Sequence, residues 1–144
     1  MAVQRTHHNV YQTHYHLVFP VKYRKALLQD DIPLAIAKIA EEISLRYDIE
    51  FEKIGYDYDH IHILASFPPK YSGSKAVRIF KSITARELFR RFPPLKQDLW
   101  GGEFWTDGYY IATISGHGNK AVIENYIRNQ GRAKDLSQLK LFEL

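Results

Sequence analysis

His60 and His62 are the residues of this chain whose types and spacing could most readily do chemistry. They alternate with Ile61 and Ile63, and this period of two, with β-branched residues between, predicts a strand. Residues i and i+2 of a strand project from the same face, so the imidazoles stand side by side and the isoleucines enter a core. The pair could supply half of a metal site, or it could be two surface histidines on a solvated sheet face.

A second candidate group lies near the C-terminus, where Asn119 to Gln130 is predicted to form a helix. Tyr126 and Gln130 are four residues apart and therefore share one helix face. They could present a nucleophilic phenol and an oxygen ligand to the same small volume. Alternatively, the tyrosine ring packs in a core and the glutamine is a solvated residue of the last turn. His14 and His16 form another histidine pair on an earlier predicted strand, so the residues alone leave the metal pair open.

Length and composition indicate one globular domain over residues 1–144, with a core over about 10–130 and a C-terminal tail over 131–144. The chain is 45% hydrophobic and 25% charged, which is ordinary for a globular protein. It has no cysteine, which excludes disulfides, thiolate metal sites and a cysteine nucleophile. It also has no long apolar run and no signal-like N-terminus, so we expect a cytoplasmic protein with no membrane segment.

The order of predicted elements is β-α-β-β-α-β with an additional C-terminal helix. The segments are a loose N-terminus over 1–9, strands over 10–19, 49–56, 59–67 and 109–115, helices over 32–47 and 72–92, and a turn-rich connector over 100–108. We expect Asp31 to cap the first helix, and Ser72 or Ser74 to cap the second. The order predicts an α+β, ferredoxin-like antiparallel sheet with helices covering one face.

Positive charge is concentrated on the second predicted helix. Residues 70–91 hold seven cations and one carboxylate, which is more positive charge than the +4 of the whole chain. The candidate DNA-binding residues there are Lys70, Lys75, Arg78, Lys81, Arg86 and Arg90. The alternative is a solvated helix face. Aromatic residues of the connector and the strand after it could stack unpaired bases or could be core and dimer contacts, namely Trp100, Phe104, Trp105, Tyr109 and Tyr110.

Several short motifs, taken together in this order, resemble one protein family. They are Tyr15-His16-Leu17-Val18-Phe19 with Lys22-Tyr23-Arg24-Lys25, then Asp59-His60-Ile61-His62, Pro68-Pro69-Lys70-Tyr71-Ser72, Leu99-Trp100-Gly101-Gly102-Glu103-Phe104-Trp105 and Tyr126-Ile127-Arg128-Asn129-Gln130. The chain resembles the single-tyrosine HUH transposases of the TnpA type, the IS200-like family of small insertion sequences. The resemblance implies that His60 and His62 are the metal pair. It also implies that Tyr126 is the nucleophile and that Gln130 is the third protein ligand. His14 and His16 are then a structural or DNA-facing pair.

The resemblance also implies an activity and its partners. The expected protein is a metal-dependent transposase that cleaves and rejoins single-stranded DNA with hairpin-forming ends through a 5′-phosphotyrosine intermediate. Two imidazoles and an amide oxygen are softer ligands than Mg²⁺ prefers, so we expect Mn²⁺ to bind more tightly and Mg²⁺ to serve in cells because it is abundant. The family implies a homodimer, and a joint over 116–118 would let the tyrosine helix act in trans.

Two other functions stay open. One is an HUH nicking endonuclease used for a purpose other than transposition. The other, from a different class, is a non-catalytic ferredoxin-like nucleic-acid-binding protein that merely keeps the histidines.

Overall fold

The computed structural model describes residues 4–5, 10–11 and 13–115. The predicted C-terminal helix, with Tyr126 and Gln130, lies outside the described residues, as do the joint over 116–118 and the tail over 131–144. The described elements are β1 (Gln4–Arg5), β2 (Val10–Tyr11), β3 (Thr13–Pro20), η1 (Lys22–Arg24), α1 (Ile32–Arg46), β4 (Glu50–Asp57), β5 (His60–Ser66), α2 (Gly73–Arg91), α3 (Leu95–Asp98) and β6 (Tyr110–Ser115).

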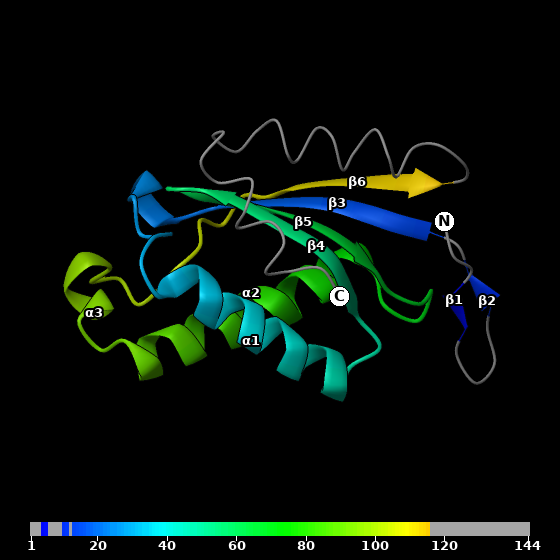
Figure 1. The fold of residues 1–144 in the computed structure, drawn as a ribbon. Coiled ribbons are helices and arrows are strands. Elements are labelled where there is room, and N and C mark those ends of the chain that lie inside the picture. The colour runs from blue at the N-terminus through cyan, green and yellow to red at the C-terminus, as the bar shows by residue number, and fades with distance from the viewer. Residues whose placement is uncertain (1–3, 6–9, 12, 116–144) are drawn as a thin grey trace.

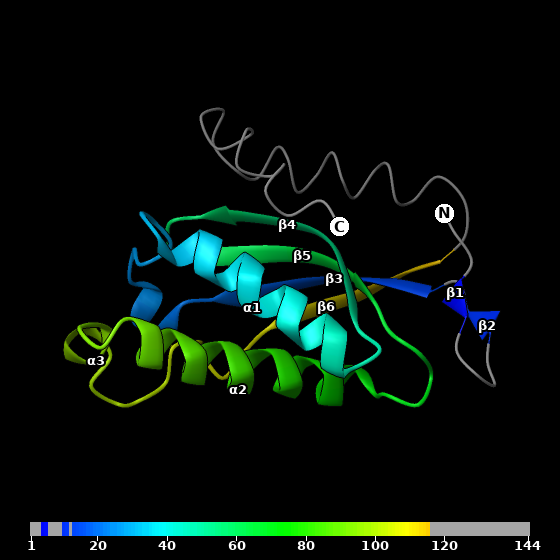
Figure 2. The same cartoon turned by 60° about the horizontal axis from the view of Figure 1, so that its bottom comes forward.

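Strands β3 to β6 form one four-stranded antiparallel sheet in the order β4-β5-β3-β6. Helices α1 and α2 pack side by side against one face of it (Figures 1 and 2). This arrangement confirms the predicted α+β, ferredoxin-like class. None of the helices in the described part of the chain is both long and apolar enough to cross a bilayer.

The register of the sheet determines which side chains share a face. In the central pair, Val18 lies opposite His62 and His16 lies opposite Leu64. Directly opposed residues of an antiparallel pair point to the same side. Accordingly, four histidines lie on one side of the sheet, which we call the histidine face: His14, His16, His60 and His62. The opposite side, the helix face, is packed against α1 and α2.

The helix face is the hydrophobic core. Ile61 and Ile63 of β5 and Phe19 of β3 are at most 1% exposed there. The Phe19 ring stacks on Phe80 of α2 with a centroid distance of 5.1 Å. Residues at positions 32, 36, 39, 40 and 43 of α1 form the buried stripe that the helical spacing predicts. The sheet is therefore held in place by apolar packing on one side, which leaves the other side for polar groups.

The two helix starts differ from each other. Ser72 caps α2, because its hydroxyl accepts a hydrogen bond from the Lys75 backbone N–H at 3.1 Å. Asp31 occupies the N-cap position of α1, as predicted, but it does not cap the helix with its side chain. Its backbone is already helical (φ −85°, ψ −8°) and its carboxylate makes no capping bond. Pro33 in the first turn has no N–H, which reduces the need for such a cap.

Three local differences from the sequence-based expectation have physical reasons. The strand predicted over 10–19 is divided, because β2 pairs with β1 in a separate two-stranded ladder while β3 pairs within the main sheet. Residues 4 and 5 are therefore in a strand, although a loose segment was expected there. The short helix α3, which follows Pro93 and Pro94, was not predicted, because four residues are too few to show helical periodicity.

Candidate functional site

His60 and His62 lie side by side at the start of β5, as the alternation predicts. Their ring centroids are 4.9 Å apart and the rings meet edge to face. His62 is buried, whereas the His60 side chain keeps 18% of its surface exposed. The strand therefore presents two imidazoles at one end of the histidine face, one of them reachable from solvent.

The ring of His60 is held by a carboxylate from the turn that precedes it. The His60 Nδ1–H donates to Asp59 Oδ1 at 2.7 Å. Arg24 Nε donates to the other carboxylate oxygen at 3.2 Å. Burial raises the pKa of the Asp59 carboxyl, but its hydrogen bond with His60 and the Arg24 charge outweigh that effect and lower the pKa overall. Asp59 is thus held as a carboxylate that orients His60.

Arg24 reaches Asp59 from a strained loop. Tyr23 and Arg24 of η1 both have left-handed backbone, with φ of 60° and 53°. Such conformations cost a non-glycine residue of the order of 1 kcal/mol each. The loop is fixed to the same turn by a backbone hydrogen bond from Val21 N–H to the Asp59 carbonyl at 2.8 Å. The surrounding contacts therefore hold η1 beside the histidine strand.

The ring of His62 has a different neighbour, the imidazole of His16 on β3. His62 Nδ1 and His16 Nε2 share a hydrogen bond of 3.3 Å, and the two rings are nearly parallel at 12°. Burial, followed by the nearby His60 and His16, lowers the pKa of His62 to about 3. Burial also lowers the pKa of His16. Both rings are therefore neutral at physiological pH, the form in which a histidine nitrogen can bind a metal.

His14 and His16 do not act as one pair. His14 is fully buried, and its Nδ1 pairs with the carboxylate of Glu52 on β4. His16 is 3% exposed and contacts His62. Neither side chain is accessible to DNA in this conformation, so the DNA-facing interpretation is wrong for both. His14 is structural, whereas His16 belongs to the candidate site.

Two of the three predicted metal ligands, His60 and His62, lie in the described part of the chain. Among the described residues, no group of three histidine, aspartate or glutamate side chains is arranged to hold a metal ion. The pair at His60 and His62 nevertheless fits a ligand role. Each has its Nδ1 engaged by a neighbouring side chain, which leaves Nε2 as the coordinating atom, and this is the usual outer-shell arrangement of metal-binding histidines. The third predicted ligand, Gln130, lies outside the described residues.

The six predicted DNA-binding cations are not one continuous surface. All lie on α2 or just before it, and α2 packs on the side of the sheet opposite the histidine face (Figure 1). Arg86 and Arg90 have Glu87 as an ionic partner, at 3.9 and 2.7 Å. Lys70 pairs with Asp48 at 2.7 Å. Within the described chain, Lys75 and Arg78 are exposed and form no ion pair, so the N-terminal half of α2 holds its least neutralised charge.

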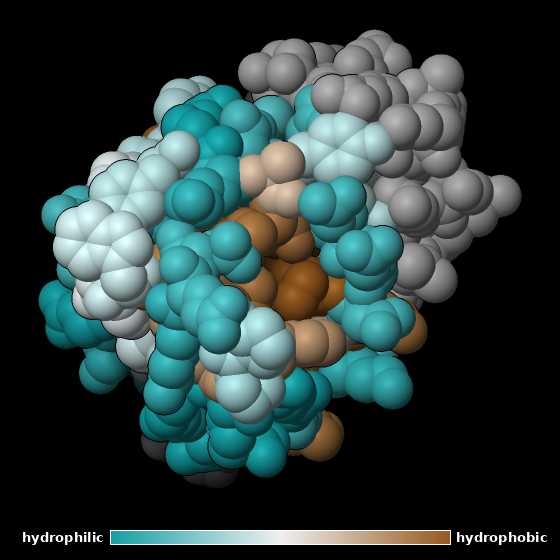
Figure 3. Space-filling model, turned by 90° about the vertical axis from the view of Figure 1, so that its left-hand side faces the viewer, coloured by the Kyte–Doolittle hydropathy of each residue, from teal (hydrophilic) through white to brown (hydrophobic). Residues whose placement is uncertain are grey.

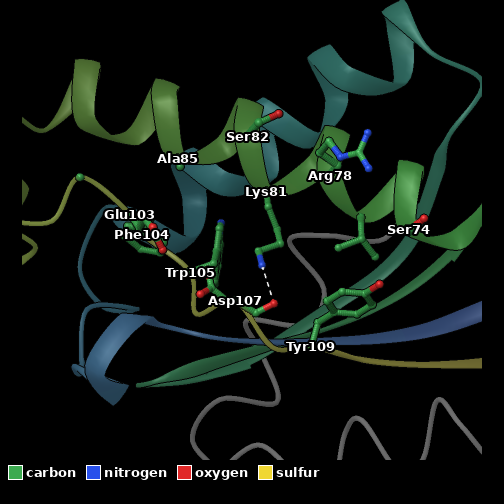
Figure 4. A pocket seen from close by; sticks show the side chains of 12 residues that line it. Ser74, Arg78, Lys81, Ser82, Ala85, Glu103, Phe104, Trp105, Asp107 and Tyr109 are labelled. Atoms are coloured by element: carbon green, nitrogen blue, oxygen red, sulfur yellow. Dashed lines mark hydrogen bonds between the residues drawn. The ribbon is translucent and has the colours of Figure 1, made fainter.

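Lys81 is directed inward. Its ammonium donates to the Thr106 carbonyl oxygen at 2.6 Å and to the Asp107 carbonyl oxygen at 3.4 Å. It crosses a cavity of about 440 Å³ between α2 and the connector (Figure 4). Burial lowers its pKa, against the raising effect of Asp107 and Glu103. The structure therefore gives Lys81 a role in holding the connector to α2.

The aromatic residues of the connector divide into two groups. Phe104 and Trp105 are in the core, where Trp105 Nε1–H donates to Thr84 Oγ1 at 2.9 Å. Trp100 is 80% exposed and stacks on Tyr23 of η1, with a centroid distance of 6.0 Å. Tyr109 and Tyr110 are also exposed. Only the exposed group could stack on an unpaired base.

The end of the molecule that carries η1 and α3 has a hollow with an apolar floor and a hydrophilic rim (Figure 3).

The site is thus a pair of histidines on a ferredoxin-like sheet, and the Nδ1 atom of each is hydrogen-bonded to a neighbouring side chain. The sequence that carries this pair also matches a known family model. Residues 9–130 match the family described as "Transposase IS200 like". The chain belongs to the IS200-like transposase family.

Individual relatives agree with this assignment. The transposase is 35% identical over 121 residues to the ISDra2 transposase TnpA of Deinococcus radiodurans, a match that covers 84% of this chain and 86% of the relative. It is 31% identical over 123 residues to the transposase for insertion sequence element IS200 of Salmonella typhimurium, covering 85% and 80% of the two chains.

Solved structures agree on the fold. The crystal structure of a candidate transposase from Deinococcus radiodurans superimposes with a TM-score of 0.70 and 32% identity, covering 90% of this chain and 99% of that one. A REP-associated tyrosine transposase bound to a REP hairpin has a TM-score of 0.61 at 12% identity, covering 90% and 72% of the two chains. The second likeness concerns the fold alone.

Sequence reasoning did not predict that three residues of this transposase contact the His60–His62 pair, namely Arg24 (through Asp59), Asp59 and His16. Asp59 directly precedes the pair, and a carboxylate beside a candidate metal-binding histidine is a recognisable signal. The alternation of His14 and His16 was a weaker signal. Only the strand register shows that His16, and not His14, contacts the pair.

Proposed function

We propose that this protein is a metal-dependent single-stranded DNA transposase that cleaves and rejoins insertion-sequence ends through a 5′-phosphotyrosine on Tyr126. The observation that carries the proposal is the geometry of His60 and His62. Two imidazoles at one end of a strand, each oriented through its Nδ1, fit a divalent cation site, and Gln130 is the proposed third protein ligand. Mn²⁺ or Mg²⁺ is the proposed ion, with Mn²⁺ the tighter on ligand type.

A divalent cation in such a site would offset negative charge on the scissile phosphate. The Tyr126 phenol, with an ordinary pKa of about 10, must lose its proton to act as the nucleophile. Its oxygen then forms a bond to phosphorus while the bond from phosphorus to the 3′ oxygen breaks. The products are a 5′-phosphotyrosine and a free 3′-hydroxyl. Attack of another DNA end's 3′-hydroxyl on that linkage would release the tyrosine and join the strands without ATP.

The proposed partners are single-stranded DNA with hairpin-forming ends and a second copy of the chain. A fold relative was solved bound to a REP hairpin, which supports a hairpin ligand here. In the proposed homodimer the tyrosine helix acts in trans, so that His60 and His62 of one chain meet Tyr126 of the other. DNA that contacts both the histidine face and the N-terminal half of α2 must pass around an edge or end of the sheet, because the two lie on opposite sides.

A covalent adduct tests the nucleophile. The full-length protein, incubated with Mn²⁺ and single-stranded DNA from the ends of its own element, should give a protein–DNA band that survives a denaturing gel. Tyr126→Phe should abolish the band while leaving DNA binding in place. Tyr110→Phe is the matched control, because Tyr110 is exposed and its ring lies edge-on to His16 at 5.6 Å.

Each alternative function gives a different result in the same assay. A non-catalytic nucleic-acid-binding protein forms no adduct in any variant. A nicking endonuclease forms the adduct but does not join two supplied ends. An adduct that persists in Tyr126→Phe and disappears in Tyr110→Phe would reject Tyr126 as the nucleophile.

DNA affinity tests whether the cations of α2 without an ion pair in the described chain, Lys75 and Arg78, contribute more to DNA binding than Arg86 and Arg90, which pair with Glu87. Changing Lys75 and Arg78 together to glutamine should weaken binding of single-stranded DNA and lower the salt dependence of binding by about one unit of slope per lost phosphate contact. Changing Arg86 and Arg90 together to glutamine removes the same charge from residues that already pair with Glu87, so the effect should be smaller. Fluorescence anisotropy at several salt concentrations measures both. Equal losses of DNA affinity in the two double variants would show that pairing with Glu87 does not decide which cations bind DNA.

A further inference from the structure

The two candidate ligand histidines are held by different partners. His60 donates to a partly exposed carboxylate, that of Asp59, whereas His62 meets a buried imidazole, that of His16. We propose that His16 is a positioning residue that fixes the proton of His62 on Nδ1 and thereby presents His62 Nε2 to the cation. This inference rests on the proposed function, because it takes His62 to be a metal ligand.

The argument begins with the single proton between the two rings. A hydrogen bond between neutral imidazoles contains one hydrogen, which belongs to either His62 Nδ1 or His16 Nε2. When His62 Nδ1 carries it, the Nε2 atom of His62 has a free lone pair. When His16 Nε2 carries it, the proton of neutral His62 must be on Nε2, and that nitrogen cannot bind a metal. Metal binding requires a deprotonated nitrogen, so the site needs the first arrangement.

The first arrangement requires His16 to accept a hydrogen bond through Nε2, the atom that faces His62. His16 Nε2 lies 3.3 Å from His62 Nδ1, and the two rings are nearly parallel at 12°, so the lone pair of a neutral His16 can point at that proton. A charged His16 would carry hydrogens on both nitrogens and could only donate. The proton arrangement that leaves His62 Nε2 open to a cation is therefore the one in which His16 is neutral and accepts.

The position of His16 is fixed by the sheet itself. It lies near the middle of β3, an inner strand of the sheet, opposite Leu64 of β5 and opposite Ala112 of β6. The ring of Tyr110 meets it edge-on at 5.6 Å. Both neighbouring strands are hydrogen-bonded to β3, which fixes the backbone of His16, and its side chain is only 3% exposed. His62 thus contacts a buried side chain of the sheet, while His60 depends on a carboxylate in a turn.

The main experiment measures Mn²⁺ affinity of the full-length protein without DNA, by electron paramagnetic resonance of the free ion. His16→Leu removes the acceptor and should weaken binding by about tenfold or more, the usual effect of losing an outer-shell partner. His16→Gln supplies an amide oxygen that can accept the same hydrogen bond, and it should restore most of the affinity.

His14→Leu is the matched control. It also replaces a buried histidine on the same strand and the same face, but its partner is Glu52 and not a candidate ligand. Both leucine variants disturb packing in a similar way, so only a specific role of His16 predicts a difference between them. Thermal unfolding of each variant shows whether the fold is kept, and His16→Gln retains a test if His16→Leu does not fold.

A second readout needs no metal. Two-bond ¹H–¹⁵N correlation spectra of the metal-free protein show which ring nitrogen of His62 carries the proton. We expect Nδ1 in the wild type and in His16→Gln, and a mixture of both positions in His16→Leu.

The inference fails if His16→Leu binds Mn²⁺ as tightly as His14→Leu does, or if the proton of wild-type His62 resides on Nε2. Failure of the proposed function looks different. In that case the wild type does not bind Mn²⁺, or His62→Ala binds it as well as the wild type does, whatever residue occupies position 16.

Discussion

On one side of β5, Ile61 and Ile63 pack among phenylalanines and the helices, and on the other side His60 and His62 each meet a polar side chain. Each face holds a buried side chain, as the 0% exposure of Ile63 and the 4% exposure of His62 show. The helix face is specified by volume and apolar area, whereas the histidine face is specified by hydrogen bonds. A residue on the first face therefore affects stability most, and a residue on the second affects chemistry most.

Adjacent substitutions on β5 give the largest expected contrast. Ile63→Ala should lower the free energy of unfolding by about 2–5 kcal/mol, because it leaves a cavity in the core. Mn²⁺ binding should persist at temperatures where the variant is folded. His62→Ala should cost less stability and abolish Mn²⁺ binding. Urea unfolding and Mn²⁺ titration measure the two effects. Loss of Mn²⁺ affinity in folded Ile63→Ala would contradict the separation of the faces.

Acid should destabilise the metal-free protein through the histidine face. Burial holds the pKa of His62 at about 3, below its ordinary value of 6.5 in the unfolded chain. Between these values the unfolded state binds the proton and the folded state does not, so stability falls as the pH is lowered below about 6.5. At pH 5 the loss from His62 alone is about 2 kcal/mol.

Urea unfolding in EDTA at pH 7 and pH 5 measures this effect. His62→Leu lacks the ionisable ring and should lose part of the pH dependence, whereas Ile63→Ala should keep all of it. Equal pH dependence in the wild type and His62→Leu would show that the buried ring does not resist protonation.

Local pattern predicted the two faces well, because alternation along β5 is a property of neighbouring residues. The His60–His62 pair and the core isoleucines lie where that period puts them. The partner of His62 was not predictable in the same way. It depends on the register between β3 and β5, which are separated in sequence by a helix and a strand. The candidate roles of Tyr126 and Gln130 stay predictions, since both lie outside the described residues.

The available charge of α2 was likewise only partly predictable from its sequence. Its sequence indicates one run of cations, but packing determines which of them are available. Glu87 lies within the run, and Glu42 of α1 pairs with Arg91 at 2.9 Å. Lys81 is used to hold the connector. Charge neutralised by a neighbouring helix cannot be recognised from the helix's own composition.

The smallest expected effects concern the exposed support of His60. Asp59→Asn keeps an oxygen acceptor for His60 Nδ1–H but removes the charge, so Mn²⁺ affinity should fall by about tenfold. Arg24→Gln should change it less, because Arg24 acts on His60 only through Asp59, and an exposed ion pair contributes about 0–1 kcal/mol. If this chain of contacts is correct, Arg24→Gln should have no further effect in the Asp59→Asn background. Lys22→Gln is the control, because Lys22 belongs to the same loop but pairs with Glu103 at 3.2 Å. Two results would mean that the loop acts by its general charge and not through the carboxylate that orients His60. One is that the Asp59→Asn and Arg24→Gln losses of Mn²⁺ affinity add up in the double variant. The other is that Lys22→Gln lowers Mn²⁺ affinity as much as Arg24→Gln does.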